Sequence, residues 1–233
     1  MTRFWANIPP TPGPTQDEYI LDAHKFGLVE HRWWRLQIGP LTLVVSERAA
    51  KVEGRRLRYT PRGQQMVADW LDAHLLTPTI VDAIWGQADV RLHPHTIGDG
   101  HGGPAPDMAR VTAWKRNDEA IDAELREQPG LVASEGKDWV LAIGLWDKSR
   151  KGKRAANYGW HTLAGKPVQP LMFGHGLSHS DYSQLGRWVT SDCCIDGKAA
   201  LFRDVLRGAH GGDVAALVGG VLPGWRQPGV EES

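Results

Sequence analysis

The sequence YGWHTLAGKPVQPLMFGHGLSHSDYSQLGRWV, residues 158–189, is the stretch around which the rest of the chain is organised. It holds three of the ten histidines, and five glycines interrupt it. A segment that only filled a core would be more apolar, and glycine lets the backbone turn tightly or approach a ligand closely. We therefore interpret this stretch as short strands that carry a functional site, with turns near Gly165 and Gly174.

The segments before and after this stretch indicate the fold class. The sequence predicts two strands within residues 31–46, helices that begin at Thr60-Pro61 and Thr77-Pro78, and another helix over about 108–126. The apolar run at 139–145 predicts a strand buried on both faces, and a helix is expected over about 199–207. Strands and helices come in separate clusters rather than in strict alternation. This favours an α+β fold with a mostly antiparallel sheet, flanking helices and one core.

The chain of 233 residues is long enough for one large domain. We expect an extended, proline-rich arm over residues 1–20, a single domain over 21–225 and a tail over 226–233. The glycine- and proline-rich loop at 96–106 is the place where that domain could divide.

The composition excludes several classes of protein. The 27 basic and 27 acidic residues balance, which argues against a dedicated nucleic-acid binder. The basic loop at 147–154 is interpreted as a solvated hairpin tip rather than a phosphate contact.

No apolar run approaches the ~20 residues of a membrane span, and the N-terminus lacks the apolar region of a signal peptide. We expect a protein that is cytoplasmic or released on lysis. Phosphate-loop, dinucleotide and nucleophile-elbow motifs do not occur, so no nucleotide cofactor is expected.

Histidines supply the candidate catalytic groups. His161 shares a strand face with Gly159, which leaves room for a group to approach the imidazole. Imidazole titrates near neutral pH and suits acid–base catalysis. We assign His161 as general base or metal ligand and His175 as its partner; a histidine hydrogen-bonded in the core is the alternative.

His175, His179 and Asp181 form the pattern H-x-x-x-H-x-D, which raises the question of a metal. Zinc takes nitrogen and oxygen ligands. This spacing indicates a shared metal site mainly when both histidines lie on a helix, where residues four apart share a face. The glycines around these histidines argue against a helix. Zinc is therefore possible but not favoured, and no metal ligand is assigned.

The triplet Asp181-Tyr182-Ser183 and Arg187 could hold an anionic substrate. Arginine clamps a carboxylate or phosphate through two parallel hydrogen bonds. An Asp181–Arg187 salt bridge that braces the strand is the alternative. Asp181 and Ser183 are assigned as catalytic, although no elbow motif supports a serine nucleophile. We predict that His161, His175, Asp181 and Arg187 meet in one cleft.

Cys193 and Cys194 are the only cysteines, and they are adjacent. A cysteine nucleophile needs a helix start and a nearby histidine. These two lie in a predicted strand before an Asp-Gly turn, so catalysis by either is not expected.

Four pieces of the chain resemble a group of uncharacterised, often secreted bacterial proteins. They are YTPRGQQMVADWL with TPTIVDAIWGQADVRLHPH; GKDWVL; YGWHTLAGKPVQPL; and HGLSHSDYSQLGRWV with IDGKAALFRDVL. The chain departs from the pattern in lacking an export signal and in having His179 and Gln184 where tyrosine and histidine are expected. The resemblance implies that nine residues lie on the shared pattern: Lys137, Asp138, His161, Gln169, His175, Asp181, Tyr182, Ser183 and Arg187.

The leading functional hypothesis is a hydrolase that acts on a polar or anionic polymer, with bacterial cell-wall peptidoglycan as the best candidate. The residues assigned to substrate contact are Arg187, Tyr182, Lys137, Gln169 and Trp160. The first alternative is a non-catalytic carbohydrate- or wall-binding module whose tryptophans stack on sugars. The second is a phosphodiesterase or nuclease that uses the basic loop.

Overall fold

The computed structural model describes residues 3–97, 111–149 and 154–231. Its largest sheet has six strands, with β2 (Trp33–Ile38) against β3 (Leu41–Ser46) as a hairpin. The rest of this sheet follows the order β14-β13-β3-β12-β6. The remaining strands are β6 (Ala73–Leu75), β12 (Trp188–Thr190), β13 (Asp192–Ile195) and β14 (Lys198–Leu201). The pairings within this sheet are antiparallel, as the sequence predicts.

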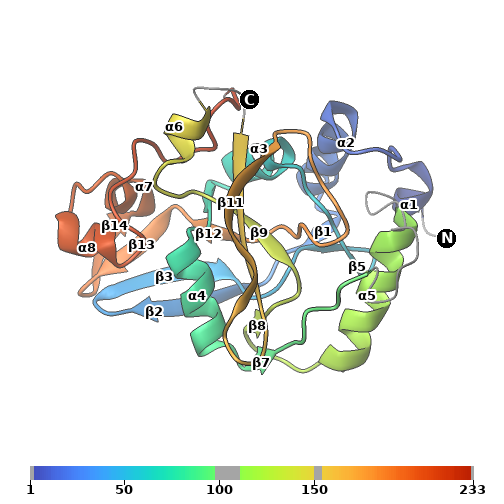
Figure 1. The fold of residues 1–233 in the computed structure, drawn as a ribbon, viewed down its shortest axis with the longest axis horizontal. Coiled ribbons are helices and arrows are strands. Elements are labelled where there is room, and N and C mark those ends of the chain that lie inside the picture. Colours follow the sequence, from blue (N-terminus) through green and yellow to red (C-terminus); the bar gives the residue numbers. More distant parts are fainter. Residues whose placement is uncertain (1–2, 98–110, 150–153, 232–233) are drawn as a thin grey trace.

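A second antiparallel sheet, in the order β11-β10-β9, carries most of the stretch that the sequence singles out. It consists of β9 (Lys137–Val140), β10 (Arg154–His161) and β11 (Pro167–Gly176), and β11 runs across the front of the molecule (Figure 1). Two further sheets occur within the described residues. One contains β1 (Val29–Glu30), β4 (Lys51–Val52) and β5 (Arg55–Arg56), and the other pairs β7 (Val90–Arg91) with β8 (Val132–Ala133) in parallel.

Helices lie around the sheets (Figure 1). They are α1 (Arg3–Asn7), α2 (Pro14–Lys25), α3 (Pro61–Trp70), α4 (Pro78–Gln87), α5 (Val111–Leu125), α6 (Leu145–Ser149), α7 (Phe202–Leu206) and α8 (Gly212–Ala216). The two predicted start signals are confirmed, because Thr60 and Thr77 accept bonds from the backbone N–H groups of Gly63 and Ile80. The described helices include none long and apolar enough to cross a membrane.

One large cluster of buried side chains spans the chain from Phe4 to Leu222, with two smaller clusters beside it. Trp114 and Trp188 are fully buried in the large cluster. The α+β fold is therefore confirmed, and the described parts on both sides of the 96–106 loop share this core. Most of that loop lies outside the described residues.

Several local predictions are wrong. Residues 3–20 do not form an extended arm but the helix α1 and most of α2, since Pro14 starts α2 and the indole N–H of Trp5 donates to the carbonyl of Val52 at 3.1 Å. The strand predicted over 139–145 ends at Val140. Residues 198–201 form β14 rather than a helix, because the turn at Asp196-Gly197 folds them back onto β13.

Candidate functional site

The register of β10 against β11 separates the two predicted catalytic histidines. His161 lies opposite Pro167, whereas Ala155 lies opposite His175. The two histidines therefore sit six positions apart along β10, or about 20 Å at the usual rise of a strand. The prediction of a single cleft is wrong, because the histidines occupy opposite ends of the ribbon instead of facing each other across it.

His175 and His179 stack face to face, with ring centroids 3.9 Å apart and planes 15° apart. The turn after β11, closed by a bond from the His179 N–H to the Gly176 carbonyl, brings the second ring back over the first. Both rings meet the face or edge of Trp139 at about right angles, with centroids 5.7 and 6.2 Å away. We call Lys137, Trp139, His175, His179 and Asp181 the histidine cluster.

Asp181 is held in one orientation beside Lys137. Its Oδ2 lies 3.5 Å from Nζ of Lys137. Its Oδ1 accepts bonds from the backbone N–H of Ser183 at 2.7 Å and from the Ser183 hydroxyl at 2.6 Å. The side chain of Ser183 is fully buried, and its hydroxyl donates to Asp181. Because a fully buried hydroxyl has no access to a substrate, this geometry does not support Ser183 as a nucleophile and gives it the role of orienting Asp181.

The surroundings keep both stacked histidines neutral. Partial burial lowers the pKa of His175, the charges of His179 and Lys137 lower it further, and Asp181 opposes them. The pKa of His179 is also lowered, mainly by burial, with Asp181 and Lys137 acting in opposite directions. A neutral imidazole keeps a lone pair on one ring nitrogen. It can therefore act as a general base at neutral pH.

Three of the buried polar atoms without a hydrogen-bond partner among the described residues belong to this cluster or to residues next to it. They are Nε1 of Trp160, Nε2 of Gln184 and Nε2 of His179. The Nζ of Lys137 lies 5.9 Å from the ring centre of Trp160. The backbones of Gln184 and Lys137 form an isolated parallel β-bridge. A buried polar group without a hydrogen bond costs roughly 1–3 kcal/mol. N–H groups beside an ammonium are suited to bind the oxygens of an anion.

Tyr182 and Trp160 pack next to the histidine cluster. Their rings pack edge to face with centroids 6.2 Å apart. The Tyr182 hydroxyl accepts a bond from the backbone N–H of Ile97 at 2.8 Å, and the Tyr182 carbonyl accepts one from Nε of the buried Arg58 at 2.7 Å. Tyr182 is itself buried. These bonds fix the 181–184 segment in place, and burial of Tyr182 argues against the predicted contact with substrate.

Arg187 does not join the cluster. It is buried and makes two parallel hydrogen bonds to Asp138, Nε to Oδ1 at 3.0 Å and Nη2 to Oδ2 at 2.6 Å. The substrate clamp with Asp181 and the alternative Asp181–Arg187 salt bridge are both wrong. Successive side chains of a strand point to opposite faces, so Asp138 faces the interior while Lys137 faces the site.

His161 is buried at the other end of β10 and bound to helix α4. Its Nε2 lies 2.9 Å from Oδ1 of Asp82, and the Tyr158 hydroxyl donates to the same oxygen at 2.8 Å. The ring also packs against Trp85. This matches the structural alternative for His161. Gln169 lies opposite Gly159 in β11 and donates to the Pro170 carbonyl, so it belongs to this end of the ribbon.

Two members of the cluster are missing from the assigned site residues. His179 enters the sequence argument only as a possible zinc ligand, and Trp139 only as part of an apolar run. Within the described ranges, no group of three histidine, cysteine or acidic side chains is placed to hold a metal ion.

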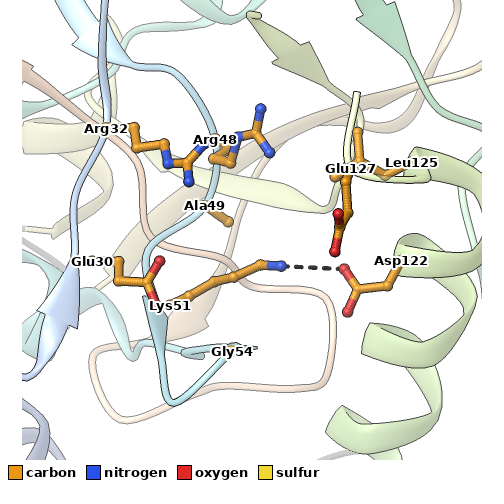
Figure 2. A pocket seen from close by; sticks show the side chains of 9 residues that line it. All are labelled: Glu30, Arg32, Arg48, Ala49, Lys51, Gly54, Asp122, Leu125 and Glu127. Atoms are coloured by element: carbon orange, nitrogen blue, oxygen red, sulfur yellow. Dashed lines mark hydrogen bonds and ion pairs between the residues drawn. The ribbon is translucent and has the colours of Figure 1, made fainter. Parts of the chain in front are cut away.

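A separate pocket of about 580 Å³ lies between β4 and α5 (Figure 2). Lys51 extends across it toward Asp122, with Nζ and Oδ1 3.2 Å apart. Three basic and three acidic side chains line it, so its charges largely offset each other. None of the nine predicted site residues lines it; the lining residues are Glu30, Arg32, Arg48, Ala49, Lys51, Gly54, Asp122, Leu125 and Glu127.

Comparison with protein-family models, with curated proteins and with solved structures gives no match to this chain. The resemblance described from the sequence therefore stays a prediction.

Proposed function

We propose that the histidine cluster is the active site of a hydrolase that acts on a polar, anionic polymer, with bacterial peptidoglycan as the leading candidate. The observation that carries this proposal is the half-buried His175, which is neutral at pH 7 and lies beside an oriented Lys137–Asp181 pair. A general base next to a fixed cation is the minimum that water-mediated hydrolysis of an anionic substrate needs.

Each residue takes one part of the reaction. His175 accepts a proton from the attacking water and returns it to the leaving group. Lys137 binds the negative charge of the substrate or of the developing oxyanion. Asp181 holds Lys137, and Ser183 holds Asp181 through two hydrogen bonds.

The strand that leads to His175 supports a polymeric substrate. β11 exposes Val168, Leu171 and Met172, each between 37 and 47% accessible. A long strand with accessible side chains provides contacts beyond the bond that is cleaved. The choice of peptidoglycan rests on the resemblance to bacterial proteins that are often secreted.

The test measures release of soluble fragments from purified peptidoglycan. We expect turnover by the wild-type protein, and a loss of about 10²-fold or more in His175→Ala, in line with the usual contribution of a general base. His210→Ala is the control, because His210 is exposed and outside the cluster. Binding to peptidoglycan without turnover would instead support the wall-binding module. Salt-sensitive binding to nucleic acid would support the nuclease.

A further inference from the structure

A second group of reactive side chains lines a pocket of about 250 Å³ that shares no residue with the histidine cluster. The hydroxyl oxygen of Ser191, between β12 and β13, lies 2.7 Å from Oδ1 of Asp72 and 3.2 Å from Nε2 of His74. The second ring nitrogen of His74, Nδ1, lies 3.4 Å from the carbonyl oxygen of Trp225. The Ser191 hydroxyl thus donates to a carboxylate and lies within reach of an imidazole nitrogen at the wall of a cavity.

The backbone holds these three residues firmly. The Ser191 N–H donates to the Asp72 carbonyl at 3.0 Å, and the Ser191 carbonyl accepts from the Phe202 N–H at 2.8 Å. The His74 ring packs on Phe202, with centroids 5.6 Å apart. Asp72 has a φ of 47°, a region that few residues other than glycine adopt. Backbone strain of this kind gathers at functional sites.

The pKa of His74 is lowered, which favours the neutral imidazole that a general base requires. Burial lowers its pKa, the Trp225 carbonyl and Asp72 oppose that effect, and Arg203 adds to it. The imidazole is therefore neutral at pH 7. In the tautomer that carries its proton on Nδ1, toward the Trp225 carbonyl, the lone pair of Nε2 is directed at Ser191, and the Ser191 hydroxyl reaches it by turning away from Asp72. A nucleophile within hydrogen-bond reach of a base whose other nitrogen is oriented by a third group is the arrangement of covalent catalysis.

We propose that Ser191 is a nucleophile activated by His74 and that this pocket takes small esters or thioesters that carry a negative charge. Arg203 and Arg226 line the pocket together with Asp69 and Asp72, and Arg226 donates to both carboxylate oxygens of Asp69. Arg203 is exposed and supplies the cation for the charge of the substrate. In the first step the bond from Ser191 Oγ to the acyl carbon forms and the bond to the leaving oxygen or sulfur breaks. The Oγ proton passes to Nε2 of His74 and then to the leaving group. Water hydrolyses the acyl-serine in the second step and restores the hydroxyl.

The experiment treats the full chain with an alkyl fluorophosphonate and maps the adduct by mass spectrometry. The Oγ–phosphorus bond forms, the phosphorus–fluorine bond breaks, the proton goes to His74 and fluoride leaves. We expect one adduct per wild-type chain, on Ser191. This readout needs no variant, so it decides the question even if a substitution prevents folding. A folded wild-type protein without an adduct, or with the adduct on another residue, overturns the proposal.

Two variants test the roles of the residues. Ser191→Ala should take no label, and His74→Gln should be labelled about 10²-fold more slowly or worse, the usual range for a general base. Ser46→Ala should be labelled like the wild type, because the Ser46 hydroxyl is also buried but bonds only to the backbone of Trp188. Labelling of a folded His74→Gln at the wild-type rate would overturn the assignment. The proposal stands apart from the histidine cluster, so His175→Ala should be labelled normally.

Discussion

Arg187 and Asp138 form a buried ion pair with two parallel hydrogen bonds, of 3.0 and 2.6 Å. Arg187 immediately precedes β12 of the six-stranded sheet, and Asp138 lies in β9 of the sheet that carries the histidine cluster. Burial alone would lower the pKa of Arg187, but the charge of Asp138 outweighs it and raises that pKa. The pair therefore joins the two sheets directly behind Lys137.

Replacement of Arg187 should destabilise the fold rather than remove substrate binding. Arg187→Met leaves the Asp138 carboxylate buried without a partner, which costs about 3–5 kcal/mol. Urea unfolding measures this loss. The double variant Arg187→Met with Asp138→Leu should recover part of it, because no charge is left uncompensated. A stable Arg187→Met protein that has lost only its activity would contradict the structural role.

His24 should make the protein sensitive to acid. Burial, with a smaller effect from His31, lowers the pKa of His24 to about 3, and its two nitrogens bond to His31 and Tyr59 at 2.9 Å. An unfolded chain protonates this histidine near its ordinary pKa of 6.5. The unfolded state therefore binds more protons between pH 6.5 and 3. The contribution of His24 to the free energy of unfolding is fully present above pH 6.5. It should fall by about 1.4 kcal/mol per pH unit as the pH decreases from 6.5 toward 3.

The control for this effect is His24→Gln, measured by urea unfolding at several values between pH 4 and 7. The dependence of its stability on pH should be weaker by about the slope of one proton. Burial raises the pKa of Asp17 to about 6, which acts in the opposite direction between about pH 4 and 6. Asp17 is present in both proteins, so its effect cancels in the difference. Equal slopes in the two proteins would refute the prediction.

His179 should be replaceable by another flat ring, whereas His175 should not. His179→Phe keeps a ring stacked on His175 but removes a neighbour that lowers the pKa of His175. The pKa of His175 should then rise, which NMR titration of the imidazole measures independently of any activity. If the proposed hydrolysis holds, the acidic limb of the rate profile should move to higher pH in His179→Phe, and His175→Phe should be inactive. An unchanged titration of His175 would contradict the coupling of the two rings.

The cysteines should be dispensable for activity. Cys193 is buried, and burial with the nearby Cys194 raises its pKa to about 11, so the thiol stays protonated and unreactive. Its Sγ lies 3.4 Å from the Ala200 carbonyl in the adjoining strand. Cys193→Ser should cost about 1 kcal/mol, within the ordinary range for one substitution, and Cys194→Ser less. Either variant, if folded, should hydrolyse substrate within a few-fold of wild type; a loss of orders of magnitude would restore the thiol mechanism.

The sequence by itself determined the features that depend on neighbours in the chain. The Thr-Pro pairs at 60–61 and 77–78 predict two helix starts correctly, because the hydroxyl caps the helix and proline suits its first position. Gly39-Pro40 marks the β2–β3 turn in the same way. The polar, glycine-rich stretch 158–189 includes the segment that holds His175 and Asp181, although it also includes His161 and Arg187, which lie elsewhere.

Only the tertiary structure decided which of these side chains meet. Arg187 could pair with Asp181, six positions away, or with Asp138, 49 positions away, and strand parity alone does not choose between them. The irregular register of β10 against β11 sets His161 and His175 at opposite ends of the ribbon. Ser191, His74 and Asp72 come together from segments more than 100 positions apart. Such contacts depend on how the sheets pack and on which charges are buried together, and these are properties of the whole chain rather than of any local pattern.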